Sequence, residues 1–401
     1  MTLKKIFIFC LLIFFSIQLS AQEYSKLVDT KIGSKGEGLA CGYNFIGATY
    51  PFGMVQFTPT FFSPQKGFVI TQLNGAGCSN LGNFPILPLR GTIQNSPNDM
   101  NSFEKFKEIK ISQAGYLSLK MNENIDVDLT VTKRSGIGKF TFNDSEYGTL
   151  IIGSGINSSP SDKIKDAFVE ITSRNSLEGY TRGGDFCGTE TDYKIYFAAE
   201  FDKPSDHNGT WKGKKLLTKK TTTGKNSGAY FTFKIDDINQ INYRIAISFV
   251  SIENAKANLK NENKHKNFES YKKETSKVWD KYLSKIKVES ENKDRVKQFY
   301  THFYHSLIHP NIVSDINGEY IGADFKVHKV DQGSEQYSSF SVWDTYRTQG
   351  QLLAILFPKK SSDMMQSLVD FADQAGGYGR WILANIETGI MQGDPTPILI
   401  S

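Results

Sequence analysis

Hydrophobic and polar side chains alternate along the chain from Gln22 to about Ser251. Ile125, Val127, Leu129 and Val131 are separated by aspartates and a threonine, which is the pattern of a strand with one face toward water. Similar strand patterns recur in residues 140–142, 193–201, 230–235 and 243–250, and the apolar run 150–152 follows a turn signal at Asn143-Asp144. Because no helical period separates these strands, residues 22–251 predict antiparallel sheets packed as a β-sandwich.

After Ser251 the apolar period lengthens to that of a helix. One predicted stripe consists of Phe268, Tyr271, Thr275, Val278, Tyr282 and Ile286. The next, which Pro310 ends, consists of Val296, Phe299, Phe303 and Leu307. Two more helices are predicted, from near Ser341 to Leu356 and from Ser361 or Ser362 to about Gln374. We therefore expect a Lys-rich helical linker over residues 252–290 and a helical domain over 291–401.

The first 21 residues form a separate segment. Lys4 and Lys5 precede an apolar stretch over residues 6–19, and a Ser-Ala pair precedes Gln22. This order predicts a signal peptide over residues 1–21, and hence a secreted or periplasmic protein without a stable membrane anchor after cleavage. The alternative is an uncleaved anchor.

Composition excludes some partners. The chain has 47 Lys and Arg against 42 Asp and Glu, and the basic residues are scattered. This excess is too small to indicate nucleic acid as a partner. Aromatic residues make up 13% of the chain. Aromatic rings stack on sugars but also fill large β-cores, so composition does not decide between these uses.

The cysteine and glycine residues do not form a known metal-binding, redox or nucleotide-binding motif. Cys41, Cys78 and Cys187 remain after signal cleavage, and their pairing stays open. No CxxC is present, and the glycine-rich segments 33–38 and 75–82 lack the spacing of a nucleotide-binding loop. Their glycines more readily predict tight turns near a cleft.

Two histidines are spaced for one face of a helix. His305 and His309 lie four residues apart, but Ser306 follows His305 where a zinc protease requires glutamate. We therefore prefer packing or surface roles for both histidines over metal binding.

Two clusters in the helical half could bind a sugar. Trp343, Asp344 and Arg347 fall at a predicted helix start, where Asp344 and Arg347 can simply pair. Alternatively, the indole stacks on a sugar ring while the carboxylate accepts hydroxyl hydrogen bonds. Asn385 and Glu387, with Asp394 further along, supply oxygen atoms suited to a hard cation or to hydroxyl groups.

Taken together, these segments resemble glycoside hydrolase family 92, the exported bacterial exo-α-mannosidases. The N-terminal motifs are Val28–Gly33, Gly47–Gln56, Gly75-Ala76-Gly77-Cys78 and Tyr196-Phe197. The later motifs are His309-Pro310-Asn311, Ser314-Asp315, Asn317–Tyr320, Trp343–Arg347 and Ala384-Asn385-x-Glu387-Thr388. The resemblance covers nearly the whole chain after residue 21.

The resemblance implies a β-sandwich packed on an (α/α)₆ barrel, of which this chain holds only the first helices. It also implies calcium-dependent, inverting removal of terminal α-linked mannose, expected to be α-1,2-linked, from N-glycans or mannan, so the expected partner is a mannose-containing glycan. Inversion requires an acid and a base roughly 6.5–9.5 Å apart. We expect both beyond Ser401, since no residue here matches them, so this chain alone should be inactive.

Several residues acquire expected roles through the resemblance. Trp343, Asp344 and Arg347 would bind the sugar, and Asn385 and Glu387 would join the mannose and calcium shell. Gly75, Gly77 and Cys78 would shape the cleft between the domains. Many family members carry histidines before this glycine loop, whereas residues 69–74 here are Val-Ile-Thr-Gln-Leu-Asn. The linkage preference, α-1,2 in many members, is therefore open, as is the oligomeric state.

Two other functions share this architecture: a non-catalytic carbohydrate-binding protein and a disaccharide phosphorylase. If the chain is a fragment, its helices should also leave apolar side chains such as Phe299 and Phe303 without partners. We then expect poor stability of the chain alone.

Overall fold

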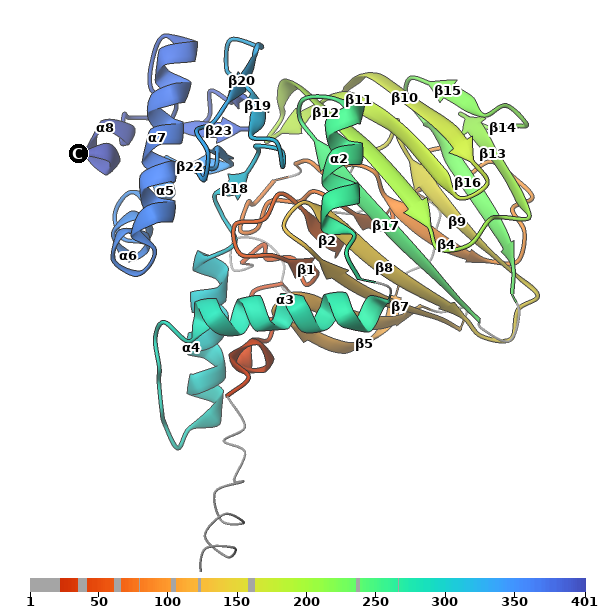
Figure 1. The fold of residues 1–401 in the computed structure, drawn as a ribbon, viewed down its shortest axis with the longest axis horizontal. Coiled ribbons are helices and arrows are strands. Elements are labelled where there is room, and N and C mark those ends of the chain that lie inside the picture. The colour runs from red at the N-terminus through yellow and green to blue at the C-terminus, as the bar shows by residue number, and fades with distance from the viewer. Residues whose placement is uncertain are drawn as a thin grey trace, which may run out of the picture.

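Two antiparallel sheets form the first part of the chain, and helices with short strands form the second (Figure 1). The computed structural model describes residues 22–34, 42–60, 66–78, 80–101, 106–121, 124–157, 163–235, 239–265 and 267–401. The predicted signal peptide and Cys41 lie outside the described residues. The predicted fold class, an antiparallel sandwich followed by helices, is confirmed.

The smaller sheet has eight strands in the order β1-β2-β3-β4-β9-β16-β13-β14. Their bounds, in that order, are Ala48–Thr49, Gln56–Pro59, Phe68–Val69, Ile86–Arg90, Tyr147–Gly153, Ser227–Lys234, His207–Lys212 and Lys215–Leu217.

The larger sheet has nine strands in the order β15-β10-β11-β12-β17-β8-β7-β6-β5. Their bounds are Thr221–Thr223, Ile164–Ser173, Ser176–Phe186, Thr189–Phe201, Gln240–Ser248, Ser135–Phe142, Ile125–Val131, Tyr116–Met121 and Phe106–Gln113.

Alternation along the strands produces the core between the sheets. In β7 the apolar residues are buried, while Asp126 and Asp128 on the other face are partly exposed, as predicted. Aromatic rings from the two sheets meet in the core, where the ring centroids of Phe201 and Phe231 lie 4.8 Å apart. Phe84, just before β4, adds a ring whose centroid lies 4.4 Å from that of Phe197. The aromatic residues of this half are therefore largely core residues.

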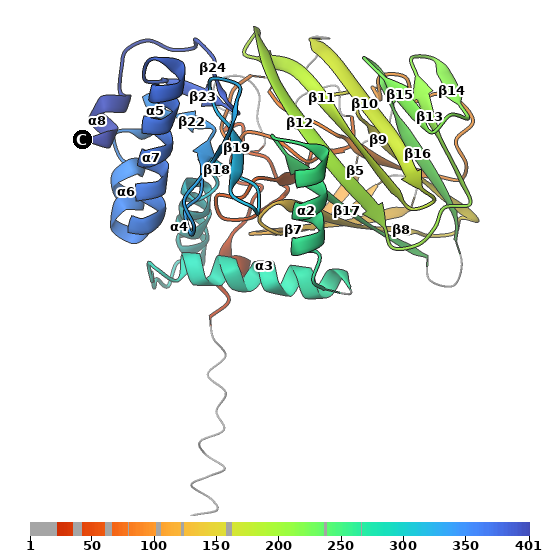
Figure 2. The ribbon, with the colours of Figure 1, turned by 45° about the horizontal axis from the view of Figure 1, so that its top comes forward.

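Three helices follow the sandwich, each with a side-chain cap at its start: α2 (Ile252–Glu262), α3 (Phe268–Leu283) and α4 (Lys293–Ser306). A further short helix, the 3₁₀ helix η1 (Tyr24–Leu27), precedes the sandwich near the N-terminus. Helix α2 lies over β12 and β17 on the outer face of the larger sheet (Figures 1 and 2). Its Ala255 and Leu259 pack there against Ala198 and Ala246.

The predicted apolar stripe of α4 is confirmed, and that of α3 is confirmed with a change near its C-terminal end. In α3, Tyr282 packs against the core as predicted, Val278 is only half-buried, and Trp279 and Leu283 are buried in addition. The indole N–H of Trp279 donates to the carbonyl of Thr49 at 2.7 Å. In α4, Phe303 is buried and Phe299 packs against the core. The expectation that these two side chains lack partners is therefore wrong, because η1 and α3 contact α4.

The helix predicted from Ser341 to Leu356 is two helices, α5 (Val342–Thr345) and α6 (Gln349–Leu356). Gln349 donates to the carbonyls of Ser306, at 2.8 Å, and His309, at 2.9 Å. This contact anchors the start of α6 at the end of α4. Helix α7 (Pro358–Ala375) begins before the predicted Ser361, because Pro358 occupies its first turn, and it ends at Gly376.

The helical half also contains short strands that its sequence pattern did not predict. They are β18 (Asn311–Ile312), β19 (Glu319–Ile321), β20 (Val327–Lys329), β21 (Tyr337–Ser338), β22 (Phe340–Ser341), β23 (Trp381–Leu383) and β24 (Ile386–Glu387), and α8 (Thr396–Ile400) follows them. Each strand has two or three residues, too few for a period to be detected. In the described residues, no helix is long and apolar enough to cross a membrane.

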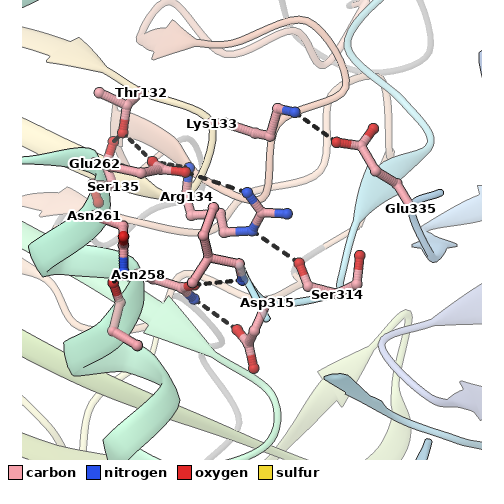
Figure 3. Close-up of polar contacts among 12 residues, drawn as sticks. Thr132, Lys133, Arg134, Ser135, Asn258, Asn261, Glu262, Ser314, Asp315 and Glu335 are labelled. Atoms are coloured by element: carbon pink, nitrogen blue, oxygen red, sulfur yellow. Dashed lines mark hydrogen bonds and ion pairs between the residues drawn. The ribbon is translucent and has the colours of Figure 1, made fainter. Parts of the chain in front are cut away.

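A polar junction joins the sandwich, α2 and the helical half (Figure 3). Arg134, in the turn between β7 and β8, donates to the carbonyl of Ser314 at 2.9 Å and pairs with Glu262 of α2 at 3.4 Å. Asp315 accepts hydrogen bonds from Ser248, Asn254 and Asn258 at 2.6–2.9 Å. These contacts fix how the two halves of the chain meet.

Candidate functional site

A cavity of about 410 Å³ lies where the sandwich loops meet the helical half. The sandwich contributes two loops, residues 73–78 and 186–187. The helical half contributes the end of α4, the start of α5 and the loop after β24. The lining residues are Leu73, Asn74, Gly75, Ala76, Gly77, Cys78, Phe186, Cys187, His305, His309, Pro310, Ser339, Phe340, Ser341, Asp344, Thr345, Gln349, Trp381, Ile390 and Met391.

Asp344 brings a carboxylate to this cavity from the first turn of α5. It accepts a hydrogen bond from the hydroxyl of Ser341. The residue is exposed, so a ligand in the cavity can reach the carboxylate. A carboxylate accepts several hydrogen bonds at once, which suits a pair of sugar hydroxyl groups.

Trp343 and Arg347 flank Asp344 but do not line the cavity. The Trp343 side chain is 44% exposed, so it is not packed into the interior. Arg347 donates to the hydroxyl of Tyr346 at 2.9 Å, and its guanidinium lies 5.3 Å from the centroid of that ring. In this described segment Arg347 makes no ion pair with Asp344, so the alternative reading, in which the two simply pair, is wrong.

The glycine loop, residues 73–78, forms another part of the cavity wall. Gly75, with φ +82, adopts a left-handed conformation that favours glycine, and Gly75 and Gly77 both line the cavity. Cys78 forms a disulfide with Cys187, which lies in the turn between β11 and β12. The disulfide therefore joins the two sandwich loops of the cavity, and it answers the pairing that the sequence left open for these two cysteines.

His309 connects this wall to the helical half. Its Nε2 accepts from the backbone N–H of Asn74 at 2.8 Å, and its Nδ1 lies 2.6 Å from Oδ1 of Asn311. Burial lowers the pKa of His309 to about 4, although the hydrogen bond to Asn311 opposes this shift. His309 is therefore neutral at pH 7, with its proton on Nδ1.

His305 also lines the cavity and is neutral at pH 7. Burial, followed by the nearby His302, lowers its pKa to about 4. Its Nε2 has no hydrogen-bond partner among the described residues. Both histidines were expected to be packing or surface residues, and the spacing in sequence gave no signal that they would face a cavity.

Asn385 and Glu387 lie on the hairpin of β23 and β24 and do not line this cavity. Asn385 donates to the carbonyl of Gly322 at 3.1 Å and borders a separate cavity of about 20 Å³. Glu387 accepts from the backbone N–H groups of Arg380, Trp381 and Gly389 at 2.8–3.2 Å. Both side chains thus brace the loops around the hairpin.

These two residues do not by themselves fit a calcium ion. Calcium requires six to eight oxygen ligands, whereas both carboxylate oxygens of Glu387 already accept backbone hydrogen bonds. Among the described residues, no three His, Cys, Asp or Glu side chains gather in a way that could hold a metal. The expected roles of Asn385 and Glu387 toward calcium remain a prediction.

Some lining residues escaped the sequence argument. Phe186 and Trp381 come from opposite halves, and their ring centroids lie 4.5 Å apart beside the cavity. Gln349 lies at the start of α6 and faces the same space. No short-range pattern could identify these residues, because their shared position depends on contacts between distant parts of the chain.

Comparison with known families covers both halves of the chain. The N-terminal domain of glycosyl hydrolase family 92 matches residues 27–248, and the catalytic domain of the same family matches residues 254–401. An uncharacterized secreted glycosidase from Arthroderma benhamiae is 24% identical over 373 residues, which cover 82% of this chain and 46% of that protein.

Solved structures show the same fold. A family 92 α-mannosidase from Bacteroides thetaiotaomicron superposes with a TM-score of 0.84 at 22% identity, over 94% of this chain and 53% of the other. That mannosidase has also been solved in complex with mannoimidazole. An inverting family 92 mannosidase from the same organism gives a TM-score of 0.81 at 21% identity, over 95% and 52% of the two chains. The present chain thus spans about half the length of these relatives.

Proposed function

The chain belongs to glycosyl hydrolase family 92, and from this membership we propose that it is the first part of an exported exo-α-mannosidase. In this proposal the 410 Å³ cavity between the sandwich and the helices receives one terminal mannose unit. The observation that carries the proposal is the position of Asp344, whose carboxylate reaches this cavity beside the glycine loop.

The cavity has the mixture of groups that a sugar requires. Asp344 would accept hydrogen bonds from two hydroxyl groups, while Phe340 and Trp381 supply apolar surface for the ring. Trp343 stays a proposed stacking group, which would require its exposed indole to turn toward the sugar. Arg347 would support Trp343 and Asp344. The mannose would be enclosed on the sandwich side by Gly75, Gly77 and Cys78.

The reacting groups would come from beyond Ser401. An inverting reaction needs one acid to protonate the leaving oxygen and one base to activate water on the opposite face. We propose calcium dependence for the complete protein, with most ligands supplied by residues other than Asn385 and Glu387. We propose export on the basis of the predicted signal peptide and the secreted glycosidase relative.

The first test is the reading frame after codon 401, which we expect to continue and to encode further carboxylates. The protein from the complete frame should release mannose from an α-linked mannobiose, and chelation with EDTA should remove the activity. Because the reaction inverts, NMR should detect β-mannose as the first product. If α-mannose appears first, the proposed mechanism is wrong.

The same assay separates the other functions. Binding of mannobiose by calorimetry without release of mannose would indicate a non-catalytic carbohydrate-binding protein. A requirement for phosphate would indicate a phosphorylase. A panel of α-1,2, α-1,3 and α-1,6 mannobioses addresses linkage, for which Leu73 and Asn74 line the cavity at the end of a segment where many family members carry histidines.

A further inference from the structure

The backbone of the glycine loop is bound to an imidazole of the other half of the chain. The N–H of Asn74 donates to Nε2 of His309 at 2.8 Å, across 235 positions of sequence. Other backbone bonds of this segment stay within the sandwich: the N–H of Leu73 donates to the side chain of Asn80 at 3.0 Å, and the N–H of Gly75 donates to the carbonyl of Tyr43 at 3.0 Å. Of these backbone bonds, the one from Asn74 to His309 is the one that ties the loop to the helical half of the chain.

The proton positions on His309 follow from its neighbour. Nδ2 of Asn311 donates to the carbonyls of Gly53 at 2.9 Å and Ile308 at 3.0 Å, which orients the amide. Its Oδ1 is thus left to accept, and the Nδ1 of His309 must carry the proton that it receives. The other nitrogen, Nε2, is then an acceptor and matches the N–H of Asn74.

We propose that His309 is a positioning residue for sugar binding. Its neutral imidazole holds the glycine loop at a fixed distance from Asp344, and this distance sets the width of the cavity. The disulfide and the contacts of the Asn74 side chain with Asn44 and Phe45 hold the loop within the sandwich. The His309 bond instead fixes the loop against the helical half, which carries Asp344.

A matched pair of variants separates the two bonds of His309. Glutamine places an amide oxygen near the position of Nε2, so His309→Gln can still accept from Asn74. Asparagine places its amide near Nδ1, so His309→Asn can donate to Asn311 but cannot reach Asn74. His207→Asn, at an exposed position at the start of β13, controls for the chemical change alone.

Amide hydrogen exchange on the 401-residue chain measures how firmly the backbone of the glycine loop is held, and it does not require the protein to be enzymatically active. We expect exchange at Asn74 to become about tenfold faster in His309→Asn, while His309→Gln and His207→Asn stay close to the wild type. Equal exchange in His309→Asn and the wild type would overturn the proposal. Equally fast exchange in both His309 variants would also overturn it, because the acceptor would not be what holds the loop.

Kinetics on the protein from the complete reading frame test the consequence for the sugar, and this part rests on the proposed function. We expect His309→Asn to raise KM about tenfold and His309→Gln to restore it to near the wild-type value. A variant that merely folds less would lower kcat and leave KM unchanged, which would overturn the positioning role. If the wild type releases no mannose, the proposed function fails, while the exchange result still decides whether His309 holds the loop.

Discussion

At the scale of single residues, Glu335 shows how a charge is held between the two halves. Its carboxylate lies 2.6 Å from the ammonium of Lys133 and 3.0 Å from that of Lys360. Burial acts to raise the pKa of Glu335, but Lys360 and Lys133 outweigh burial and lower it to about 2. Lys133 lies in the turn between β7 and β8 and Lys360 lies in α7, so this carboxylate bridges the two halves. Figure 3 shows its contact with Lys133.

We expect Glu335→Gln to reduce the free energy of unfolding by roughly 1–3 kcal/mol at pH 7, because two partly buried lysines lose their anion. The folded pKa lies below the ordinary value, so the wild-type advantage is present above pH 4.5 and is lost as pH falls toward 2. Urea unfolding at pH 7 and at pH 3 measures this. Glu23→Gln, which breaks an exposed pair with Lys26, is the control and should cost less than about 0.5 kcal/mol. A constant difference across this pH range would contradict the account.

Asp344 carries the second prediction at this scale. In the complete protein, Asp344→Asn should lower kcat/KM about 10–100-fold, because hydrogen bonds to a charged acceptor contribute roughly 1.5–3 kcal/mol. The melting temperature should not fall, since the side chain is exposed. Asp373→Asn, at an exposed position of α7, is the matched control. Unchanged kinetics in Asp344→Asn would remove this residue from the sugar site.

At the scale of elements, the disulfide determines how the two sandwich loops of the cavity are held. Cys78 and Cys187 are 109 positions apart, so their bond closes a long loop of the unfolded chain. The double variant Cys78→Ser and Cys187→Ser should lose roughly 2–5 kcal/mol of stability.

Guanidinium unfolding with and without reductant measures this loss. The reductant should destabilise the wild type and leave the double variant unaffected. A wild type that is equally stable in both conditions would show that the bond does not constrain the chain. Because the disulfide supports the cavity wall, the reduced protein should also show faster amide exchange in residues 73–78.

Sequence pattern predicted the long elements well at this scale. β7, β12, α3 and α4 each extend over enough residues for a period of two or 3.6 to emerge. The break between α5 and α6 was not predicted, because Gln349 is fixed by carbonyls at the end of α4. The strands β18–β24 are too short to carry a period and form through tertiary pairing.

At the scale of the whole molecule, apolar side chains of the last helices face solvent. Ile355 on α6 is 78% exposed and Ile398 on α8 is 64% exposed. The sequence predicted that Phe299 and Phe303 would lack packing partners, but the exposed apolar side chains of the last helices are Ile355 and Ile398. Exposed apolar surface of this kind promotes association.

We therefore expect the 401-residue chain to self-associate and to bind a hydrophobic dye. The double variant Ile355→Lys and Ile398→Lys should reduce both effects in light scattering and fluorescence. Ile111→Lys, at an exposed position of the sandwich, is the control and should leave both unchanged. A soluble monomer with a sharp cooperative melt would contradict this expectation.

The sequence by itself determined the sandwich, the long helices and the family, because periodicity and ordered motifs are local properties of the chain. It also drew attention to Asp344 and the glycine loop. Only the tertiary structure decided that these two line one cavity, that Cys78 pairs with Cys187, and that His309 accepts a hydrogen bond from the backbone of Asn74. It also placed Asn385 and Glu387 away from that cavity. The physical reason is that such contacts join residues a hundred or more positions apart, and their geometry depends on how two packed halves meet.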